Sequence, residues 1–199
     1  RAKQAATIWN ETIHINGTPA EAYLRRRGIT CTLPVVLRYH RSCWNGPTAR
    51  RHPAMIALVE GGDGFAIHRT YILPDGTGKA EITPNKMMLG GTAGGAVRLT
   101  AGGAGLVVAE GIETALSLAC GLLHEPMAIW AALSTSGIEA LHLPDDPGRL
   151  IVASDGDDAG RKAAHKLAER ADALGWRVEL LPAPEGQDWN DMLLCEVQP

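Results

Sequence analysis

The segment at residues 150–160 constrains the fold more than any other part of the chain. It reads Leu-Ile-Val-Ala-Ser-Asp-Gly-Asp-Asp-Ala-Gly, an apolar run that ends in a cluster of acids. Such a run is typical of a parallel strand buried on both faces, and the amphipathic segment after the second glycine predicts a helix. The acids then follow the carboxyl end of a strand, where open α/β sheets bind their ligands.

Two of these acids, Asp155 and Asp157, lie two residues apart, so in an extended chain their side chains face the same way. Carboxylates held at one point repel each other unless a cation neutralises them, and an oxygen-only ligand set favours Mg²⁺ or Mn²⁺. In the alternative interpretation, Asp155 ends the strand and Asp158 caps the helix. That alternative accounts for one or two of the acids and not for all three, so we predict a metal site.

The second half of the chain alternates between strand and helix patterns. Strands are predicted over 105–110, 127–133, 150–154 and 177–181, and helices over 111–120, 138–143 and 159–174. Strands separated by helices imply right-handed crossovers and a parallel sheet. We therefore expect a Rossmann-like α/β fold with a parallel four-stranded sheet and flanking helices.

The first half has a different pattern. Helices are predicted over 2–15 and 18–27, and strands over 33–44, 54–60 and 65–73, with a Gly-Gly-Asp-Gly hairpin turn between the last two strands. This order predicts a smaller α+β subdomain with antiparallel strands. We place the boundary near residue 101, which gives the domains 1–100 and 101–199.

A glycine-rich stretch at 79–100 carries three cations, Lys79, Lys86 and Arg98. Glycine-rich backbone next to cations can cradle phosphate. The same composition also suits a flexible connection between domains, and the sequence alone leaves both interpretations open.

Charge is distributed unevenly along the chain. Residues 1–100 contain 13 Lys and Arg against 6 Asp and Glu, and residues 101–199 contain 6 against 16. A basic half joined to an acidic half suggests a polyanionic partner for one and a metal for the other, although two solvated faces would give the same totals. No stretch resembles a membrane span or a signal peptide, so we expect a cytoplasmic protein. The chain begins with Arg1, which suggests a piece of a longer protein.

Carboxylates follow three of the predicted strands. Glu110 follows the first, Asp155 and Asp157 follow the third, and Asp188 and Asp191 follow the fourth. In a doubly wound sheet these strand ends share one edge, so the acids are expected to converge there. Such a set suits phosphodiester or phosphoryl transfer with one or two metal ions. Glu110 is then a general acid/base or a metal ligand.

The sequence resembles a known family at this point. A strand followed by Glu110-Gly111, then a strand followed by Asp-Gly-Asp-Asp-Ala-Gly at 155–160, is similar to the Toprim domain of bacterial-type DNA primases, type IA and II topoisomerases and some nucleases. The second motif looks most like the primase branch, and the resemblance covers roughly residues 104–195. Residues 64–90 are similar to the segment just before Toprim in primase catalytic cores. Residues 20–40 and 65–99 also resemble the N-terminal part of Toprim primase-like proteins of plasmids, phages and integrative elements.

The resemblance implies roles for individual residues. Glu110 matches the invariant Toprim glutamate, and Asp155 and Asp157 match the metal-binding pair. Asp188 matches the later acidic position, with Asp191 as the alternative. In the first half, the resemblance implies that Arg69 and Lys86 lie near template or nucleotide, and we add Arg98 and Lys79 as candidate nucleic-acid-binding residues.

The function implied by the resemblance is that of a DNA primase catalytic core. Such a nucleotidyltransferase uses Mg²⁺ or Mn²⁺ to synthesise short RNA primers on single-stranded DNA from nucleoside triphosphates. A replicative helicase and a zinc-binding module often accompany such cores. The alternatives are a Toprim metal-dependent nuclease and a non-catalytic nucleic-acid-binding module. A topoisomerase is disfavoured because no tyrosine-bearing cleavage domain is evident, and the accessory first half favours a primase over a nuclease.

Overall fold

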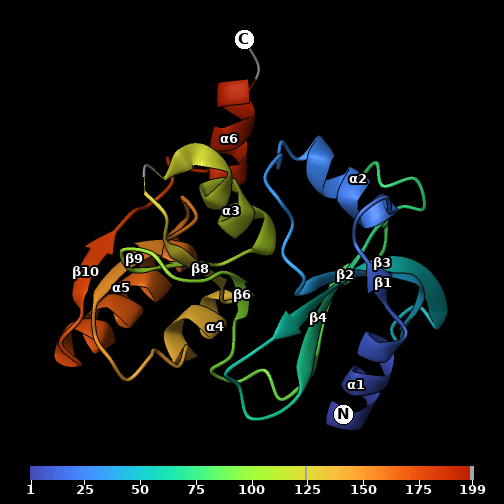
Figure 1. Cartoon of the computed structure of the whole chain (residues 1–199), viewed down its shortest axis with the longest axis horizontal. Coiled ribbons are helices and arrows are strands. Elements are labelled where there is room, and N and C mark those ends of the chain that lie inside the picture. Colours follow the sequence, from blue (N-terminus) through green and yellow to red (C-terminus); the bar gives the residue numbers. More distant parts are fainter. Residues whose placement is uncertain (124, 198–199) are drawn as a thin grey trace. The chain divides into compact units, whose positions relative to one another are not determined.

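The chain folds into two compact units, Arg1–Thr92 and Ala93–Pro199, each built around its own five-stranded sheet. The computed structural model describes residues 1–123 and 125–197 (Figure 1). The sheet of the first unit is antiparallel throughout, and the sheet of the second is mostly parallel. The predicted fold class, a smaller α+β part followed by an α/β part, is therefore confirmed.

The first unit contains two helices and a meandering sheet. Its elements are α1 (Ala2–Asn10), β1 (Ile13–His14), α2 (Pro19–Arg26), β2 (Leu37–Asn45), β3 (Arg50–Val59), β4 (Ala66–Tyr71) and β5 (Lys86–Gly90). The strands lie in the order β1-β2-β3-β4-β5. Sequential strands that pair as neighbours are what short antiparallel connections produce.

Strand β4 is the most enclosed element of this sheet, since all six of its residues are buried. Ile67 and Tyr71 pack in one apolar cluster with Ala5 of α1, so helix α1 covers that face of the strand. Because side chains alternate along a strand, Arg69 points to the same face as Ile67 and Tyr71. Strand β4 thus has a charged residue inside the packed layer.

The helix predicted over residues 2–15 is wrong at its C-terminal end. Helix α1 ends at Asn10, and Ile13–His14 form β1, which pairs with β2 through Ile13 and Tyr39. The Thr12 hydroxyl donates a hydrogen bond of 2.6 Å to the carbonyl oxygen of Trp9. A side chain that satisfies a terminal carbonyl in this way competes with continuation of the helix.

The second unit has five strands and helices between them. Its elements are β6 (Val97–Thr100), β7 (Leu106–Ala109), α3 (Ile112–Ser117), the π-helical turn η1 (Leu118–Leu122), β8 (Ala128–Ala131), α4 (Thr135–Ala140), β9 (Arg149–Ala153), α5 (Asp158–Ala173), β10 (Arg177–Leu180) and α6 (Trp189–Val197). The sheet order is β10-β9-β7-β8-β6. The four predicted strands run parallel, and β6 adds an antiparallel edge.

Helices lie on both sides of this sheet. Helices α4 and α5 pack against one face of the sheet, where Leu167 of α5 shares an apolar cluster with Val108 and Val152. Helix α3 packs against β7, β8 and α6. Burial on both faces explains why β7 and β9 are near-continuous apolar runs in the sequence.

Strands β5 and β6 were not predicted. Both lie in the glycine-rich stretch that was interpreted as a phosphate cradle or a connection, and the pairing of β6 with β8 joins residues about thirty positions apart. The chain passes between the compact units at Thr92 and Ala93. Separate domains over 1–100 and 101–199 stay a prediction.

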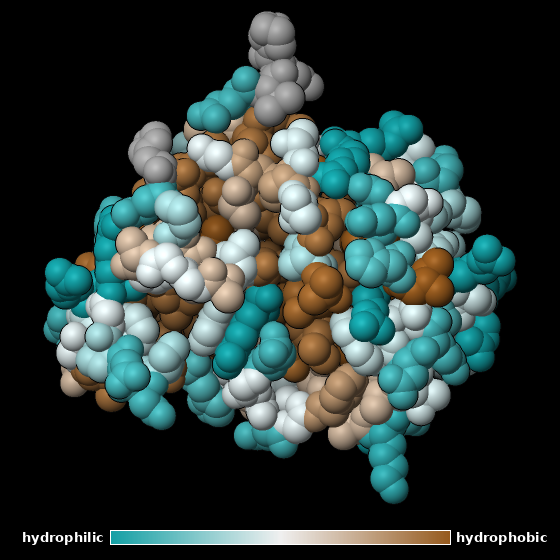
Figure 2. All heavy atoms as spheres, in the orientation of Figure 1, coloured by the Kyte–Doolittle hydropathy of each residue, from teal (hydrophilic) through white to brown (hydrophobic). Residues whose placement is uncertain are grey.

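Hydrophilic side chains cover much of the face drawn in Figure 2. Across residues 1–123 and 125–197, none of the helices has both the length and the apolar character needed to cross a lipid bilayer.

Candidate functional site

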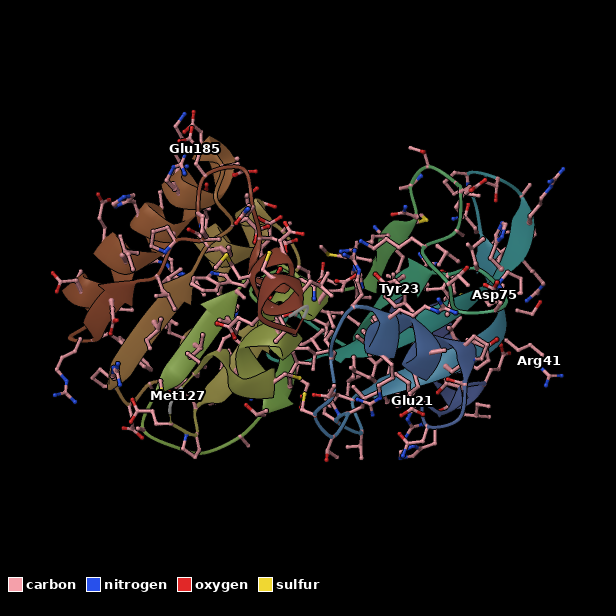
Figure 3. All side chains as sticks on the ribbon, turned by 90° about the horizontal axis from the view of Figure 1, so that it is seen from above. Glu21, Tyr23, Arg41, Asp75, Met127 and Glu185 are labelled. Carbon is pink, nitrogen blue, oxygen red and sulfur yellow. The ribbon has the colours of Figure 1, made fainter. Side chains whose placement is uncertain are left out.

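The parallel sheet has a topological switch point between β7 and β9. From β7 the chain crosses to β8 on one side and then returns to β9 on the other side of β7. Connections that leave in opposite directions open a crevice at the carboxyl ends of the two central strands, and α/β proteins bind ligands there. Met127 at the amino end of β8 and Glu185 in the loop after β10 mark the two opposite ends of the sheet (Figure 3).

Acidic residues follow both strands at the switch point. Ala109 of β7 and Ala153 of β9 are register partners, so the chains leave the sheet side by side. Glu110 is the first residue after β7, and Asp155 is the second after β9. Both are partly buried. The sheet topology thus brings these two predicted site residues to neighbouring strand ends, about 5 Å apart in the backbone.

The loop after β9 is bonded to the loop after β10. Gly156 N donates to the Gln187 carbonyl at 2.8 Å, Gly186 N donates to the Gly156 carbonyl at 2.9 Å, and Ala183 N donates to the Ser154 carbonyl at 2.9 Å. A Cβ at position 156 would collide with the Pro184 carbonyl oxygen, so only glycine permits this approach. This backbone contact carries Asp188 to the aspartates of the β9 loop.

These loops form a shallow depression that we call the acidic edge. It has a volume of about 220 Å³ and is lined by Asp155, Gly156, Asp157, Gly186, Gln187, Asp188 and Asp191. The predicted aspartates are therefore brought together, and both candidates for the later acidic position are present. Glu110 lies on the neighbouring strand and outside this lining.

Asp157 is the N-cap of α5, which corrects the expectation that Asp158 serves the helix start. The Asp157 Oδ1 accepts a hydrogen bond of 2.6 Å from Gly160 N. Asp158 instead forms an ion pair of 3.0 Å with Arg161. The hydrogen bond from Arg161, followed by the charges of Arg161 and Lys162, lowers the pKa of Asp158 below its ordinary value. Arg161 also donates to the Gly156 carbonyl at 3.1 Å, so it binds the loop itself.

Asp188 and Asp191 cap the start of α6 reciprocally. The Asp188 Oδ1 accepts from the backbone N–H groups of Asn190 and Asp191 at 2.8 and 2.9 Å, and the Asp191 Oδ2 accepts from Asp188 N at 3.0 Å. This is the arrangement of a capping box, with Asp in place of the usual Glu. These hydrogen bonds fix the positions of the two carboxylates. They also occupy part of the capacity of each carboxylate to accept further hydrogen bonds.

Asn190 anchors this acidic turn in the core. It is fully buried, and its Nδ2 donates a hydrogen bond of 2.9 Å to the hydroxyl of Ser117, at the end of α3. The Ser117 hydroxyl in turn donates to the Glu113 carbonyl at 2.9 Å. Asn190 is not among the site residues predicted from the sequence, although its place near two acids in a polar turn was a usable signal.

The donor chemistry of the acidic edge fits Mg²⁺ or Mn²⁺, because its charged ligands are all carboxylates. The side chains do not converge as a coordination shell: within the described ranges, no three His, Cys, Asp or Glu residues are grouped closely enough to hold an ion. The Oδ1 atoms of Asp157 and Asp188 face backbone N–H groups instead. The residues therefore have the right ligand atoms for such an ion and lie in the same depression. To bind it, their carboxylate groups must rotate away from the backbone N–H groups.

The four predicted cations belong to different parts of the chain. In the first sheet, Arg69 pairs with Met87 and Thr70 pairs with Lys86, so alternation puts Arg69 and Lys86 on opposite faces. Lys79 sits at an isolated bridge to Ile72. Arg98 belongs to the second sheet and lies over the Trp130 ring at 4.4 Å from its centroid. Their roles toward nucleic acid stay predictions.

Two family models match the chain. Residues 1–99 match a family described as a domain of unknown function, DUF7146, and residues 105–197 match the Toprim domain. No curated protein matches the chain.

Several solved structures are similar to the chain. A DNA primase domain from Pseudomonas aeruginosa is 21% identical with a TM-score of 0.45, and the match covers 78% of this chain and 52% of that one. The RNA polymerase domain of the Mycobacterium tuberculosis primase is 17% identical with a TM-score of 0.48, covering 97% and 77%. The same domain in complex with double-stranded DNA is 16% identical with a TM-score of 0.47, covering 96% and 74%. The chain thus spans about half the length of the Pseudomonas domain.

The Toprim match begins just before β7 and ends with α6, so it contains Glu110, the acidic edge and the switch point between β7 and β9. The resemblance expected from the two acidic motifs is confirmed, since residues 105–197 match the Toprim domain model.

Proposed function

We propose that the chain is the catalytic core of a DNA primase, a nucleotidyltransferase that copies single-stranded DNA into short RNA primers. The observation that carries the proposal is the acidic edge of a Toprim domain, with Glu110 on the adjoining strand end. The Asp-Gly-Asp-Asp-Ala-Gly run at 155–160 adds support, because it resembles the primase branch of that family.

Asp155, Asp157 and Asp188 are the proposed holders of Mg²⁺ or Mn²⁺, with Asp191 beside them. When bound, the ion neutralises charge on the transferring phosphate and orients its oxygens. The chain itself supplies the alignment. The bonds of Gly156 to the second loop fix the separation of the two acidic segments, and the Asn190 side chain holds the α6 end in place.

Glu110 is the proposed general base. Glu110 follows the strand next to that of Asp155 and lies outside the lining of the acidic edge. It can therefore accept a proton while the aspartates bind the ion. In primer extension it would accept the proton of the attacking 3′-hydroxyl as the new phosphodiester bond forms, while the bond between the α- and β-phosphates breaks and pyrophosphate leaves. An acid at this place is equally compatible with hydrolysis, so it does not itself separate synthesis from cutting.

The first unit is the proposed template holder. Its excess of Lys and Arg supplies a sequence-independent attraction to the DNA backbone that weakens steeply with salt. In this unit Arg69, Lys86 and Lys79 are the proposed contacts with nucleic acid or nucleotide, and Arg98 of the second unit is a further one. Nucleoside triphosphates are the second substrate. A replicative helicase and a zinc-binding module are proposed as partners.

The test supplies labelled ribonucleotides and circular single-stranded DNA to the chain, with Mg²⁺ or Mn²⁺. Template-dependent short products are expected, and Asp155→Asn should remove them. Asp172→Asn is the matched control, because it makes the same change at an exposed position near the C-terminal end of α5. Equal loss in both variants would separate the activity from the acidic edge.

Two other outcomes lead to other functions. Metal-dependent nicking of the circle, lost in Asp155→Asn, would replace synthesis with a nuclease. Salt-sensitive DNA binding without either activity would indicate a non-catalytic binding module, a function favoured by the fact that the aspartates do not converge on one point among the described residues.

A further inference from the structure

A pocket in the first unit lies outside the acidic edge. It has a volume of about 340 Å³ and is lined by residues of α1 and of the sheet, among them Glu11, His40, Trp44, Arg51 and Arg69. We call it the α1 pocket. Its volume is within the range of pockets that bind small molecules.

Arg69 places a positive charge in this pocket. It is only 6% exposed, and it hydrogen-bonds with the Trp44 carbonyl at 3.2 Å, the Tyr71 hydroxyl at 3.1 Å and the Met88 carbonyl at 3.5 Å. All of these partners are neutral. The Nε of Arg69 is buried and makes no hydrogen bond, and the structure as described pairs no carboxylate with this guanidinium. A buried charge without a counterion is unfavourable, and an entering anion would relieve that cost.

The acid that lines the pocket is engaged elsewhere. The His40 Nδ1 accepts from Ser42 N at 3.1 Å, so its Nε2 carries the proton and donates to Glu11 at 3.1 Å. Arg51 lines the same pocket, is exposed, and donates to the Ser42 carbonyl at 2.9 Å. The lining therefore carries two guanidinium groups against one carboxylate that is already hydrogen-bonded.

The pocket also offers apolar surface. Trp44 lines the pocket and is 47% exposed, which is a large exposed fraction for a tryptophan. An exposed aromatic ring beside two arginines is suited to a ligand that combines an anionic group with a flat ring.

We propose that the α1 pocket binds a nucleoside monophosphate. Arg69 and Arg51 would hold the phosphate, since Arg69 has N–H donors that its neutral partners do not use. The base would lie against Trp44. The site is separate from the face that carries Lys86, and it needs no metal.

The proposal is tested by titrating the full chain with AMP in a calorimeter, with EDTA present. Arg69→Gln and Arg51→Gln should each weaken binding about tenfold or more, the loss expected for a charge-assisted hydrogen bond. Arg51 is exposed, so Arg51→Gln tests the site even if the substitution at the buried Arg69 disturbs folding. Arg41→Gln removes the same charge from an exposed position of β2 outside the pocket lining and should leave AMP binding unchanged.

Further ligands separate the two parts of the site. Adenosine should bind far more weakly than AMP. Equal binding of inorganic phosphate and AMP would overturn the contact with the ring. AMP binding that survives both Arg69→Gln and Arg51→Gln, or that falls equally in Arg41→Gln, would overturn the site. The result does not depend on the proposed function, because Asp155→Asn should bind AMP as the unchanged chain does, whether or not primers are made.

Discussion

The two sheets of this protein differ in where their polar residues lie. In the first, the inner strand β4, which lies between β3 and β5, buries His68, Arg69 and Thr70 in succession. In the second, β7 is entirely apolar, and the polar groups begin at Glu110, immediately beyond it. The difference follows from topology. A parallel sheet covered on both faces leaves its strand ends as the accessible place for chemistry.

The comparison shows where function and stability are coupled. Changes at the acidic edge alter loops beyond the core, whereas a change at Arg69 alters a residue packed between Ile67 and Tyr71 on the face that α1 covers. We therefore expect substitutions at the edge to affect ligands more than folding, except where backbone contacts fix the edge. The following measurements challenge or refine that contrast.

The largest expected effect concerns two thiols, one in each unit. Burial raises the pKa of the Cys43 thiol, which is enclosed in the α1 cluster, whereas Cys195 on α6 is exposed. Cys195 should react with iodoacetamide at least on the order of a hundredfold faster at pH 8, since Cys43 becomes accessible only when the first unit opens. Peptide mass spectrometry over time measures both rates. Comparable rates would show that the first sheet is not the closed layer described above.

The next effect is on the backbone contact of the acidic edge. Gly156→Ala should reduce the free energy of unfolding by about 1–3 kcal/mol, because the added Cβ collides with Pro184 and the loops must separate. Gly148→Ala is the control, since a Cβ there meets its nearest atom, in Trp176, at 3.9 Å. Denaturant unfolding followed by circular dichroism compares the two. If both variants were equally stable, the edge would be looser than its hydrogen bonds indicate.

A smaller effect is expected for the buried contact between α6 and α3. Asn190→Ala and Ser117→Ala should each cost about 1–3 kcal/mol, with a coupling of about 1 kcal/mol in the double-mutant cycle. The coupling arises because the second substitution removes a partner that is already lost. Additive costs would mean that the two side chains do not act through their hydrogen bond. The contrast between the sheets would then be sharper, with no buried polar pair supporting the edge.

The smallest effect is at the exposed start of α5. Arg161 lowers the pKa of Asp158, so the ion pair stabilises the fold at pH values above the ordinary 3.8 and is lost as the pH falls through the lower, folded-state pKa. Arg161→Ala should move the pKa of Asp158 up towards 3.8, and Lys162→Ala should move it less. Carboxyl chemical shifts in an NMR titration report both. A larger shift in Lys162→Ala would reverse the assigned order of causes.

Much of the second unit follows from its sequence. Strands β7 and β9 are short apolar runs followed at once by acids, so the sheet and its functional edge are encoded within a few neighbouring residues. The roles within the edge are less accessible. Both Asp157 and Asp158 are plausible caps by residue type, and only the backbone path after Gly156 decides for Asp157.

The first unit is less predictable because its pattern depends on distant partners. Strand β5 is only partly buried along its length, so its sequence lacks a clear alternation. Residues Ile13–His14 pair with a strand that starts only at Leu37, and no feature of the sequence near residue 13 predicts that pairing. The opposite facing of Arg69 and Lys86 likewise requires the register of β4 and β5. Information of this kind lies between segments rather than within one.

The pairing of β7 with β9 also has a consequence in time. Leu106 aligns with Leu150, so the two strands can join only after the chain between them, including β8, has been accommodated. Closing long loops to form parallel pairs is slow compared with local helix formation. Glu110 and Asp155 therefore remain apart in early collapsed states, and a cation present during folding has no assembled acidic edge to bind until the central strands have aligned.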